Sequence, residues 1–394
     1  MAAGAIAMSE PDRAELSAIV ELTLVPGVGS LTQARIKATC ASIQQAYRLP
    51  AAELEALALP PDAVEALHSR RYRNMADEIL DWCDKERCMI LARGKPGYPA
   101  LLEEIYDPPM VLYARGRVES LTRPGVAIVG TRRPTPYGLL MAEGLAADLG
   151  ARGIAVVSGL ARGVDAAAHR GCLDGGGWTV AVLGSGIDIV YPREHRRMSV
   201  EVEKRGLLLS EFPPGTSPSP QNFPVRNRII SCLSLGTLIV EASEYSGSLI
   251  TARLAMEQNR EVFALPGNLT SPQSFGPNFL IKQGAKLVQS WRDIVEELPP
   301  EIRHDILLKE GLRKEELPSM ELLCQDERAA LALLGTDQAL HFDCLLRASG
   351  LEVSRLCNLL LDLEMRGYVR QLPGNLYVKT IRPRSSAGAA MTPG

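Results

Sequence analysis

The chain has 394 residues, which is enough for two or three domains and at least one large core. Its 43 lysines and arginines nearly balance 46 aspartates and glutamates, so the net charge of -3 excludes a strongly basic protein, and any anion site depends on where individual arginines lie. No apolar run reaches membrane length, and the eight cysteines lack CxxC or zinc-type spacing. We therefore expect a cytoplasmic protein with buried, reduced thiols, no membrane contact, no metal and no cofactor.

The first segment predicts an N-terminal helical domain over residues 10–85. Apolar spacing favours helices at 13–24, 31–46, 51–57 and 61–85. Between the first two lies Leu24-Val-Pro-Gly-Val-Gly29, a pattern typical of a helix-hairpin-helix turn whose backbone N–H groups face a phosphate. A tight turn between two core helices explains it equally well, and no cation follows before Arg35. A helix-hairpin-helix or SAM-like domain is expected, with both roles of the turn open.

The central segment, residues 86–298, predicts a doubly wound α/β domain with an extended Rossmann-like sheet. From about Pro124 to Trp291, short apolar runs alternate with helical patterns. The predicted strands are 126–130, 155–158, 179–183, 206–212, 237–242 and 261–265. These runs are continuous rather than alternating with polar residues, which indicates burial on both faces and hence a mainly parallel sheet.

Glycine, hydroxyl and arginine residues follow several of these strands. The turns are Gly130-Thr-Arg132, Ser158-Gly-Leu-Ala-Arg-Gly163, Gly184-Ser-Gly186 and Ser246-Gly-Ser248. Ligands of open parallel sheets bind outside the carboxyl ends of the strands. Helix N-termini and arginine guanidiniums at that edge suit phosphate oxygens. The sequence therefore predicts a ligand that carries phosphates.

The kind of phosphate ligand follows from what these turns lack and contain. Neither the G-x-G-x-x-G dinucleotide pattern nor the Walker A pattern occurs after a strand, so NAD and ATP fit poorly. Arginines spread over separate turns suit an extended backbone, and Phe223, three residues before Arg226, offers a ring on which a base can stack. Core packing explains Phe223 equally well. The pattern favours single-stranded nucleic acid.

Catalytic and metal-binding candidates are few. Asp165 and His169 lie one helical turn apart near Ser158, which allows a triad, although helical Asp–His pairs are usually structural. Glu211 and Glu241 end two strands and could hold a metal, but such carboxylates more often orient arginines or cap helices. We expect no catalysis and no metal.

The C-terminal segment predicts a winged-helix domain over residues 319–380. Helical patterns at 322–334, 341–349 and 353–366 are followed by two strands joined by Leu372-Pro-Gly-Asn375. The third helix carries acidic as well as basic residues, which favours protein contacts or weak duplex binding over tight duplex binding. Residues 381–394, rich in Ser, Ala, Gly and Pro, predict a disordered tail.

Four stretches of the central segment closely resemble the motifs of the DNA-processing protein A family, also called Smf. They are Val126-Ala-Ile-Val-Gly-Thr-Arg-Arg-Pro-Thr-Pro-Tyr-Gly138, Ser158-Gly-Leu-Ala-Arg-Gly-Val-Asp-Ala-Ala-Ala-His169, Phe223-Pro-Val-Arg-Asn-Arg-Ile-Ile230 and Ser246-Gly-Ser-Leu-Ile-Thr-Ala252. The resemblance runs from about Tyr98 to Ala285. It implies a homodimer that binds single-stranded DNA without sequence preference, helps to load the RecA recombinase in natural transformation, and has no established catalytic activity.

The resemblance also carries over a set of DNA-binding residues. Phe223 is implied as the base-stacking ring. The other implied residues are Gly130, Thr131, Arg132, Arg162, Arg226, Asn227, Arg228, Ser246, Gly247 and Ser248. Two features depart from the family: residues 218–222 lack a lysine often found there, and Val225 replaces an arginine. We therefore expect binding that is weaker or more sensitive to salt and that depends on Arg132, Arg226 and Arg228.

One alternative function comes from a related fold. Phosphoribohydrolases that release the base from a nucleotide carry a Pro-Gly-Gly-x-Gly-Thr-x-x-Glu motif at a strand end. The comparable stretch here, residues 240–248, lacks that motif. A nucleotide-processing enzyme of this type remains the alternative, and release of free base would support it.

Overall fold

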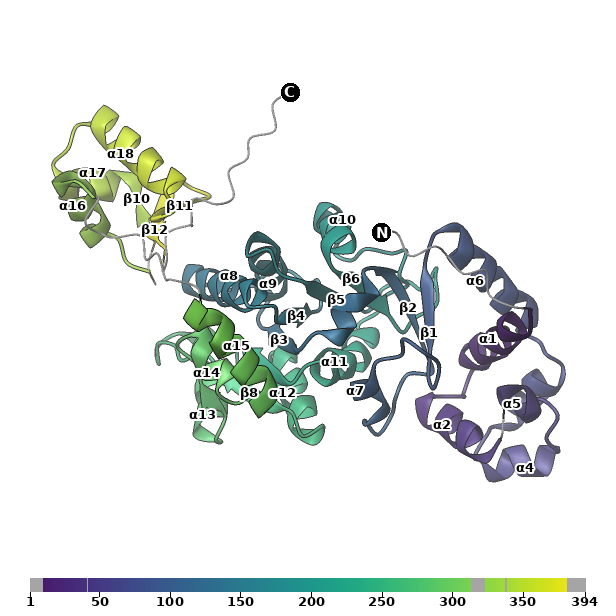
Figure 1. Ribbon diagram of the computed structural model, residues 1–394. Coiled ribbons are helices and arrows are strands. Elements are labelled where there is room, and N and C mark those ends of the chain that lie inside the picture. The colour runs from purple at the N-terminus through teal and green to yellow at the C-terminus, as the bar shows by residue number, and fades with distance from the viewer. Residues whose placement is uncertain (1–9, 41, 313–322, 337–338, 381–394) are drawn as a thin grey trace.

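The computed structural model describes residues 10–40, 42–312, 323–336 and 339–380. It contains an N-terminal group of helices, a central sheet with helices on both faces, and a small C-terminal unit (Figure 1). Residues 319–322 and the predicted tail at 381–394 lie outside the described residues. The predicted domain limits at 85, 298 and 319 stay predictions.

The N-terminal part consists of short helices joined by tight turns. They are α1 (Glu10–Leu24), α2 (Ser30–Thr39), α3 (Ile43–Ala46), α4 (Ala51–Ala56), α5 (Pro61–His68) and α6 (Arg73–Lys85). The predicted helices at 31–46 and 61–85 are each broken in two. The first break follows from the extended backbone of Cys40, and the second from Arg70, whose φ of 51° is incompatible with a continuous helix. Gly27, with φ of 82°, makes the turn between α1 and α2.

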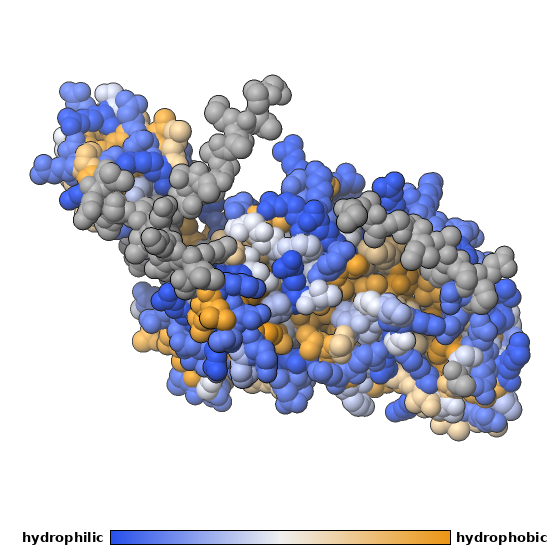
Figure 2. All heavy atoms as spheres, viewed as in Figure 1, coloured by the Kyte–Doolittle hydropathy of each residue, from blue (hydrophilic) through white to orange (hydrophobic). Residues whose placement is uncertain are grey.

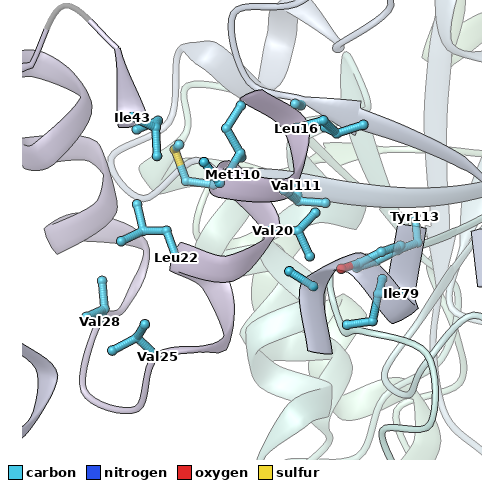
Figure 3. Close-up of a cluster of buried hydrophobic side chains, with 14 of the residues drawn as sticks. Leu16, Val20, Leu22, Val25, Val28, Ile43, Ile79, Met110, Val111 and Tyr113 are labelled. Atoms are coloured by element: carbon cyan, nitrogen blue, oxygen red, sulfur yellow. The ribbon is translucent and has the colours of Figure 1, made fainter. Parts of the chain in front are cut away.

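These helices share a core with the first strands of the sheet. Leu16 and Val20 of α1 and Ile79 of α6 lie beside Val111 and Tyr113 (Figure 3). Val111 and Tyr113 belong to β2 (Val111–Gly116), and the Tyr113 side chain is fully buried. The N-terminal part is therefore packed directly on one edge of the sheet.

The sheet has the predicted parallel centre and an antiparallel edge that was not predicted. Its strands are β1 (Met89–Ala92), β2, β3 (Gly125–Val129), β4 (Ala155–Ser158), β5 (Thr179–Leu183), β6 (Leu207–Ser210), β7 (Gly236–Ile239), β8 (Glu261–Ala264) and β9 (Lys286–Leu287). Their order is β1-β2-β6-β5-β4-β3-β7-β8-β9. The strands from β6 to β9 in this order pair in parallel, whereas β2 runs antiparallel to β6 and β1 antiparallel to β2. The doubly wound fold is confirmed.

Both faces of the central strands are buried because neighbouring residues point to opposite sides. In β3, Val126 and Ile128 pack with α8 (Pro136–Ala151) and α9 (Val164–Asp174), whereas Ala127 and Val129 pack with α11 (Asn222–Cys232) and α12 (Gly247–Glu257). The remaining helices of this part are α7 (Ala100–Glu103), α10 (Arg196–Arg205), α13 (Phe275–Lys282), α14 (Trp291–Val295) and α15 (Pro300–Leu312), with 3-10 turns η1 (Val118–Thr122), η2 (Arg193–His195) and η3 (Pro272–Ser274).

The C-terminal unit is a winged helix, as predicted. It contains α16 (Gln325–Leu333), β10 (Leu340–His341), α17 (Phe342–Ser349), α18 (Val353–Met365), β11 (Val369–Leu372) and β12 (Leu376–Lys379). Leu345, Leu356, Leu360 and Leu363 form its core. Gly350, in the left-handed region with φ of 64°, separates α17 from α18.

All eight cysteines are free, but only five of them are buried. Cys357, one of the thiols expected to be buried, is exposed because the inward positions of α18 are Leu356, Leu360 and Leu363. Across the described residues, no helix combines the length and the apolar character needed to span a membrane. The same residues contain no group of three or more His, Cys, Asp or Glu side chains arranged for a metal.

Candidate nucleic-acid interface

The turns after β3 and β7 are bonded to one another at the carboxyl edge of the sheet. The Thr131 N–H donates to the Glu241 carbonyl at 2.7 Å, and the Val164 N–H donates to the Thr131 carbonyl at 3.2 Å. A Cβ at Gly130 would lie 2.7 Å from Val164 Cγ2, so only glycine fits there without movement. Gly130 and Thr131 therefore serve to hold the backbone that presents Arg132, which is exposed.

Glu241 organises this turn rather than a metal site. Its buried carboxylate accepts the Thr135 N–H at 2.8 Å and the Thr135 hydroxyl at 2.5 Å, and Thr135 is the N-cap of α8. A Cβ at Gly138 would lie 2.3 Å from Glu241 Oε2. The sequence left three roles open for Glu241, namely binding a metal, orienting an arginine and capping a helix, and the structure supports helix capping.

Phe223 lies over the end of β5, at the start of α11. A Cβ at Gly184 would be 2.7 Å from Phe223 Cδ1, so the absence of a side chain at Gly184 lets the ring approach the backbone after β5. The Arg132 guanidinium lies 5.3 Å from the ring centroid, within cation–π range. Tyr191 is the other aromatic neighbour, with ring centroids 5.8 Å apart. Phe223 is half-buried and is not a core residue.

Around this ring lies a surface hollow, which we call the Phe223 hollow. Its lining residues are Arg132, Gly159, Ala161, Arg162, Gly184, Ser185, Tyr191, Pro192, Phe223 and Arg226. The structure thus brings together four of the predicted binding residues: Arg132 and Arg162 from two separate turns, and Phe223 and Arg226 from α11. It adds Tyr191 and Pro192, which sequence reasoning missed because an aromatic in an irregular loop gives no periodic signal.

Arg226 forms the buried floor of the Phe223 hollow. Its Nη1 donates to the Gly159 carbonyl at 2.7 Å and also to the Val182 carbonyl. Burial lowers the pKa of this guanidinium to about 10, and the charge on Arg132 adds to the effect, while Asp165 opposes it. Arg226 remains charged at neutral pH, so this almost fully buried side chain places a positive charge beneath the hollow.

The structure places the Arg228 guanidinium in a cluster of ion pairs, whereas the sequence predicted that it contacts DNA. Its guanidinium is buried and binds the Glu211 carboxylate at 2.5 and 2.6 Å and Asp107 at 3.1 Å. These two carboxylates compete with any phosphate for the same donors. Glu211 therefore orients an arginine, which is one of the roles that the sequence allowed for a carboxylate at a strand end. Asn227 accepts from Arg226 Nε at 3.3 Å.

The remaining predicted residues are Arg162 and the turn from Ser246 to Ser248. They lie at the carboxyl edge of the sheet, with less direct access to the Phe223 hollow. Arg162 lines it, but its guanidinium forms two hydrogen bonds of 2.7 Å with the Glu194 carboxylate, and both side chains are more than half exposed. Ser246 and Ser248 flank Gly247 at the start of α12, and their hydroxyl oxygens are 2.8 Å apart. The three residues of this turn follow β7 and do not line the Phe223 hollow.

Asp165, His169 and Ser158 are each hydrogen-bonded to other groups and not to one another, so they do not form a triad. Asp165 accepts the N–H groups of Gly159 and Ala161 at 3.1 and 3.4 Å, and burial raises its pKa. His169 Nε2 accepts the Leu160 N–H at 3.3 Å, and Nδ1 lies 2.7 Å from the Thr179 hydroxyl. The Ser158 hydroxyl donates to the Ile128 carbonyl at 2.7 Å.

The tautomer of His169 follows from these hydrogen bonds. The Thr179 hydroxyl donates its proton to the Val156 carbonyl at 2.7 Å, so its oxygen accepts from Nδ1–H. Burial lowers the pKa of His169 to about 3, and the nearby His195 and Arg226 add to the effect. His169 is therefore neutral and holds the turn that carries Arg162.

The fold and this edge define a Rossmann-like α/β protein with glycine- and arginine-bearing strand ends, joined to a winged helix. Residues 89–299 match the family described as DNA recombination-mediator protein A, and residues 315–375 match the DprA winged helix domain. The chain belongs to this DNA recombination-mediator protein A family.

Individual relatives agree with this assignment. The chain is 38% identical to Protein Smf of Escherichia coli (strain K12) over 317 residues, which is 79% of this chain and 82% of the relative. It is 47% identical to DNA processing protein DprA of Bacillus subtilis (strain 168) over 203 residues, 51% of this chain and 68% of the relative. The X-ray structure of DNA processing protein A from Streptococcus pneumoniae matches with a TM-score of 0.61 at 32% identity, covering 74% of this chain and 99% of that one.

Proposed function

We propose that this protein binds single-stranded DNA at the carboxyl edge of its sheet and serves DNA processing in natural transformation. The observation that carries the proposal is the Phe223 hollow, in which an accessible aromatic ring lies beside the exposed Arg132 and above the buried charge of Arg226. Base stacking on an aromatic ring requires an unpaired base, which favours a single strand over a duplex. Relatives named DNA processing protein support the role.

The binding itself is tested with a fluorescein-labelled oligo(dT) and a duplex of equal length, titrated across salt. We expect the single strand to bind more tightly and Arg132→Ala to weaken it, because a phosphate contact and the orientation of the Phe223 ring are both lost. Arg48→Ala, an exposed arginine of the N-terminal part, is the charge-matched control. Equal binding by Arg132→Ala and the unchanged protein would refute this use of the site.

We propose that the protein is a binder rather than an enzyme. The phosphoribohydrolase motif ends in a glutamate, and the comparable stretch of this chain ends in Ser248. Glu241, a carboxylate directly after β7, is buried and bonded to Thr135. Asp165 and His169 are likewise committed to backbone groups and to Thr179. Release of free base from nucleoside monophosphates during incubation with the protein would support the phosphoribohydrolase alternative.

We propose RecA recombinase and a second copy of the chain as partners, in the cytoplasm. Membership in a recombination-mediator family supports RecA. An exposed aromatic pair supports self-association: Phe275 and Phe279 of α13 stack with centroids 6.2 Å apart, and each is nearly half exposed. Phe279→Asp should convert a dimer to a monomer in light scattering, and RecA strand-exchange assays on coated single strands test the loading role.

We propose protein contacts for the winged helix. The basic residues in α18 and directly after it are paired with acids: Arg355 with Asp326, and Arg366 with Glu327 and Asp362. Its exposed face carries apolar side chains, with Leu361 and Met365 more than half exposed. Tight duplex binding by the full chain would contradict this role.

A further inference from the structure

The Phe223 hollow borders a second aromatic ring and a run of arginines. Tyr191 is 44% exposed, and its ring plane is tilted by 35° from that of Phe223. Pro192, which also lines the hollow, leads directly into η2 and α10. Three arginines in these two elements are exposed and make no salt bridge to another described residue; they are Arg193, Arg196 and Arg197. Hydrophilic side chains gather over α10 (Figure 2).

Two contacts hold this run beside the strand ends. The His195 Nδ1 atom is 2.8 Å from the Leu160 carbonyl, which joins η2 to the turn after β4. The Glu194 carboxylate binds Arg162, itself a lining residue of the hollow. Residues three apart on a helix lie on the same side, so Arg197 follows Glu194 along the side that faces Arg162. The arginine run is therefore continuous with the hollow.

The charge of this run adds to that of Arg132, the exposed arginine in the lining of the hollow. Arg226 is buried and its Nη1 already donates to two carbonyl groups, Arg228 is paired with Glu211, and residues 218–222 contain no cation. A single strand whose base enters the hollow must therefore find most of its further phosphate contacts outside it. The unpaired arginines nearest to the second aromatic ring meet this requirement.

We propose that Tyr191, Arg193 and Arg197 form a second nucleotide subsite, in which Tyr191 stacks on the neighbouring base and the arginines bind the phosphates that follow. The proposal rests on the single-strand binding proposed above. In this proposal the single strand of DNA runs from the Phe223 hollow across Tyr191 to η2 and the first turn of α10. Arginine suits this role because its fork meets two phosphate oxygens at once.

The test compares full-length variants on fluorescein-labelled oligo(dT) of about six and about twenty nucleotides, across salt. Arg193→Ala combined with Arg197→Ala should lower the slope of log affinity against log salt by about 1.4 on the longer strand, since each lost phosphate contact removes about 0.7. The loss of affinity should be larger for the longer strand. Tyr191→Ala should weaken binding by about 5- to 150-fold.

The matched control removes the same charge elsewhere. Arg48→Ala combined with Lys85→Ala changes two exposed cations of the N-terminal part and should leave the slope unchanged. If the unchanged protein binds but the Arg193 and Arg197 variant keeps its salt slope on the longer strand, the second subsite is refuted and the Phe223 hollow stands. If the unchanged protein binds neither strand, the proposed function fails, and the subsite with it.

Discussion

The contact between Phe223 and Gly184 can be disrupted by a single methyl group. In Gly184→Ala, the new Cβ would lie 2.7 Å from Phe223 Cδ1 and 3.0 Å from Cε1. Carbon atoms in contact need about 3.5–4.0 Å, so the ring must retreat by about 1 Å. Gly184 does not use the left-handed backbone region, so the substitution acts through this contact rather than through backbone strain.

The expected cost falls on binding more than on folding. Phe223 is half-buried at the start of a helix and can swing outward, so we expect the free energy of unfolding to fall by about 1 kcal/mol. A displaced ring no longer presents its face to a base, and a lost base stack is worth roughly 1–3 kcal/mol, or about 5- to 150-fold in affinity.

Fluorescence anisotropy with labelled oligo(dT) measures the affinity, and urea unfolding measures the stability. Gly144→Ala on α8 is the matched control, because a Cβ there meets nothing within 4 Å. A double-mutant cycle with Phe223→Ala isolates the mechanism, since Gly184→Ala should have no further effect once the ring is gone. Unchanged affinity in Gly184→Ala, or an equal loss in the Phe223→Ala background, would refute the reasoning.

Three further predictions follow from the edge of the sheet. In the unfolded chain His169 takes up a proton near pH 6.5, whereas in the folded chain it does so only near its pKa of about 3. The free energy of unfolding therefore falls as the pH drops through this window, by about 2 kcal/mol at about pH 5. His169→Gln should flatten this part of a plot of urea midpoint against pH, and identical profiles for the two proteins would contradict the role of His169. Glu194→Gln should tighten single-strand binding and steepen its salt slope by about 0.7, because Arg162 is freed for a phosphate; weaker binding would count against this. Gly138→Ala should lower the free energy of unfolding by about 2–4 kcal/mol by displacing the buried Glu241 carboxylate, and an unchanged thermal midpoint would show that the carboxylate can move aside.

Much of the architecture could be predicted because it depends on local patterns. The continuous apolar runs at 126–130 and 155–158 indicate strands buried on both faces, and parallel strands must end at one edge. The antiparallel strands β1 and β2 were missed. Val111 and Tyr113 of β2 face the N-terminal helices, a contact with residues far away in the chain that no short window of sequence contains.

The sequence by itself determined the doubly wound sheet, the winged helix and the row of glycine- and arginine-bearing turns, because apolar periodicity and turn residues act over a few neighbours. Only the tertiary structure decided which arginines remain free. Arg226 and Arg228 are two residues apart on one helix, yet one lies under the Phe223 hollow and the other is paired with Asp107 and Glu211. Whether a guanidinium is available for phosphate depends on carboxylates and carbonyl groups that only folding brings beside it.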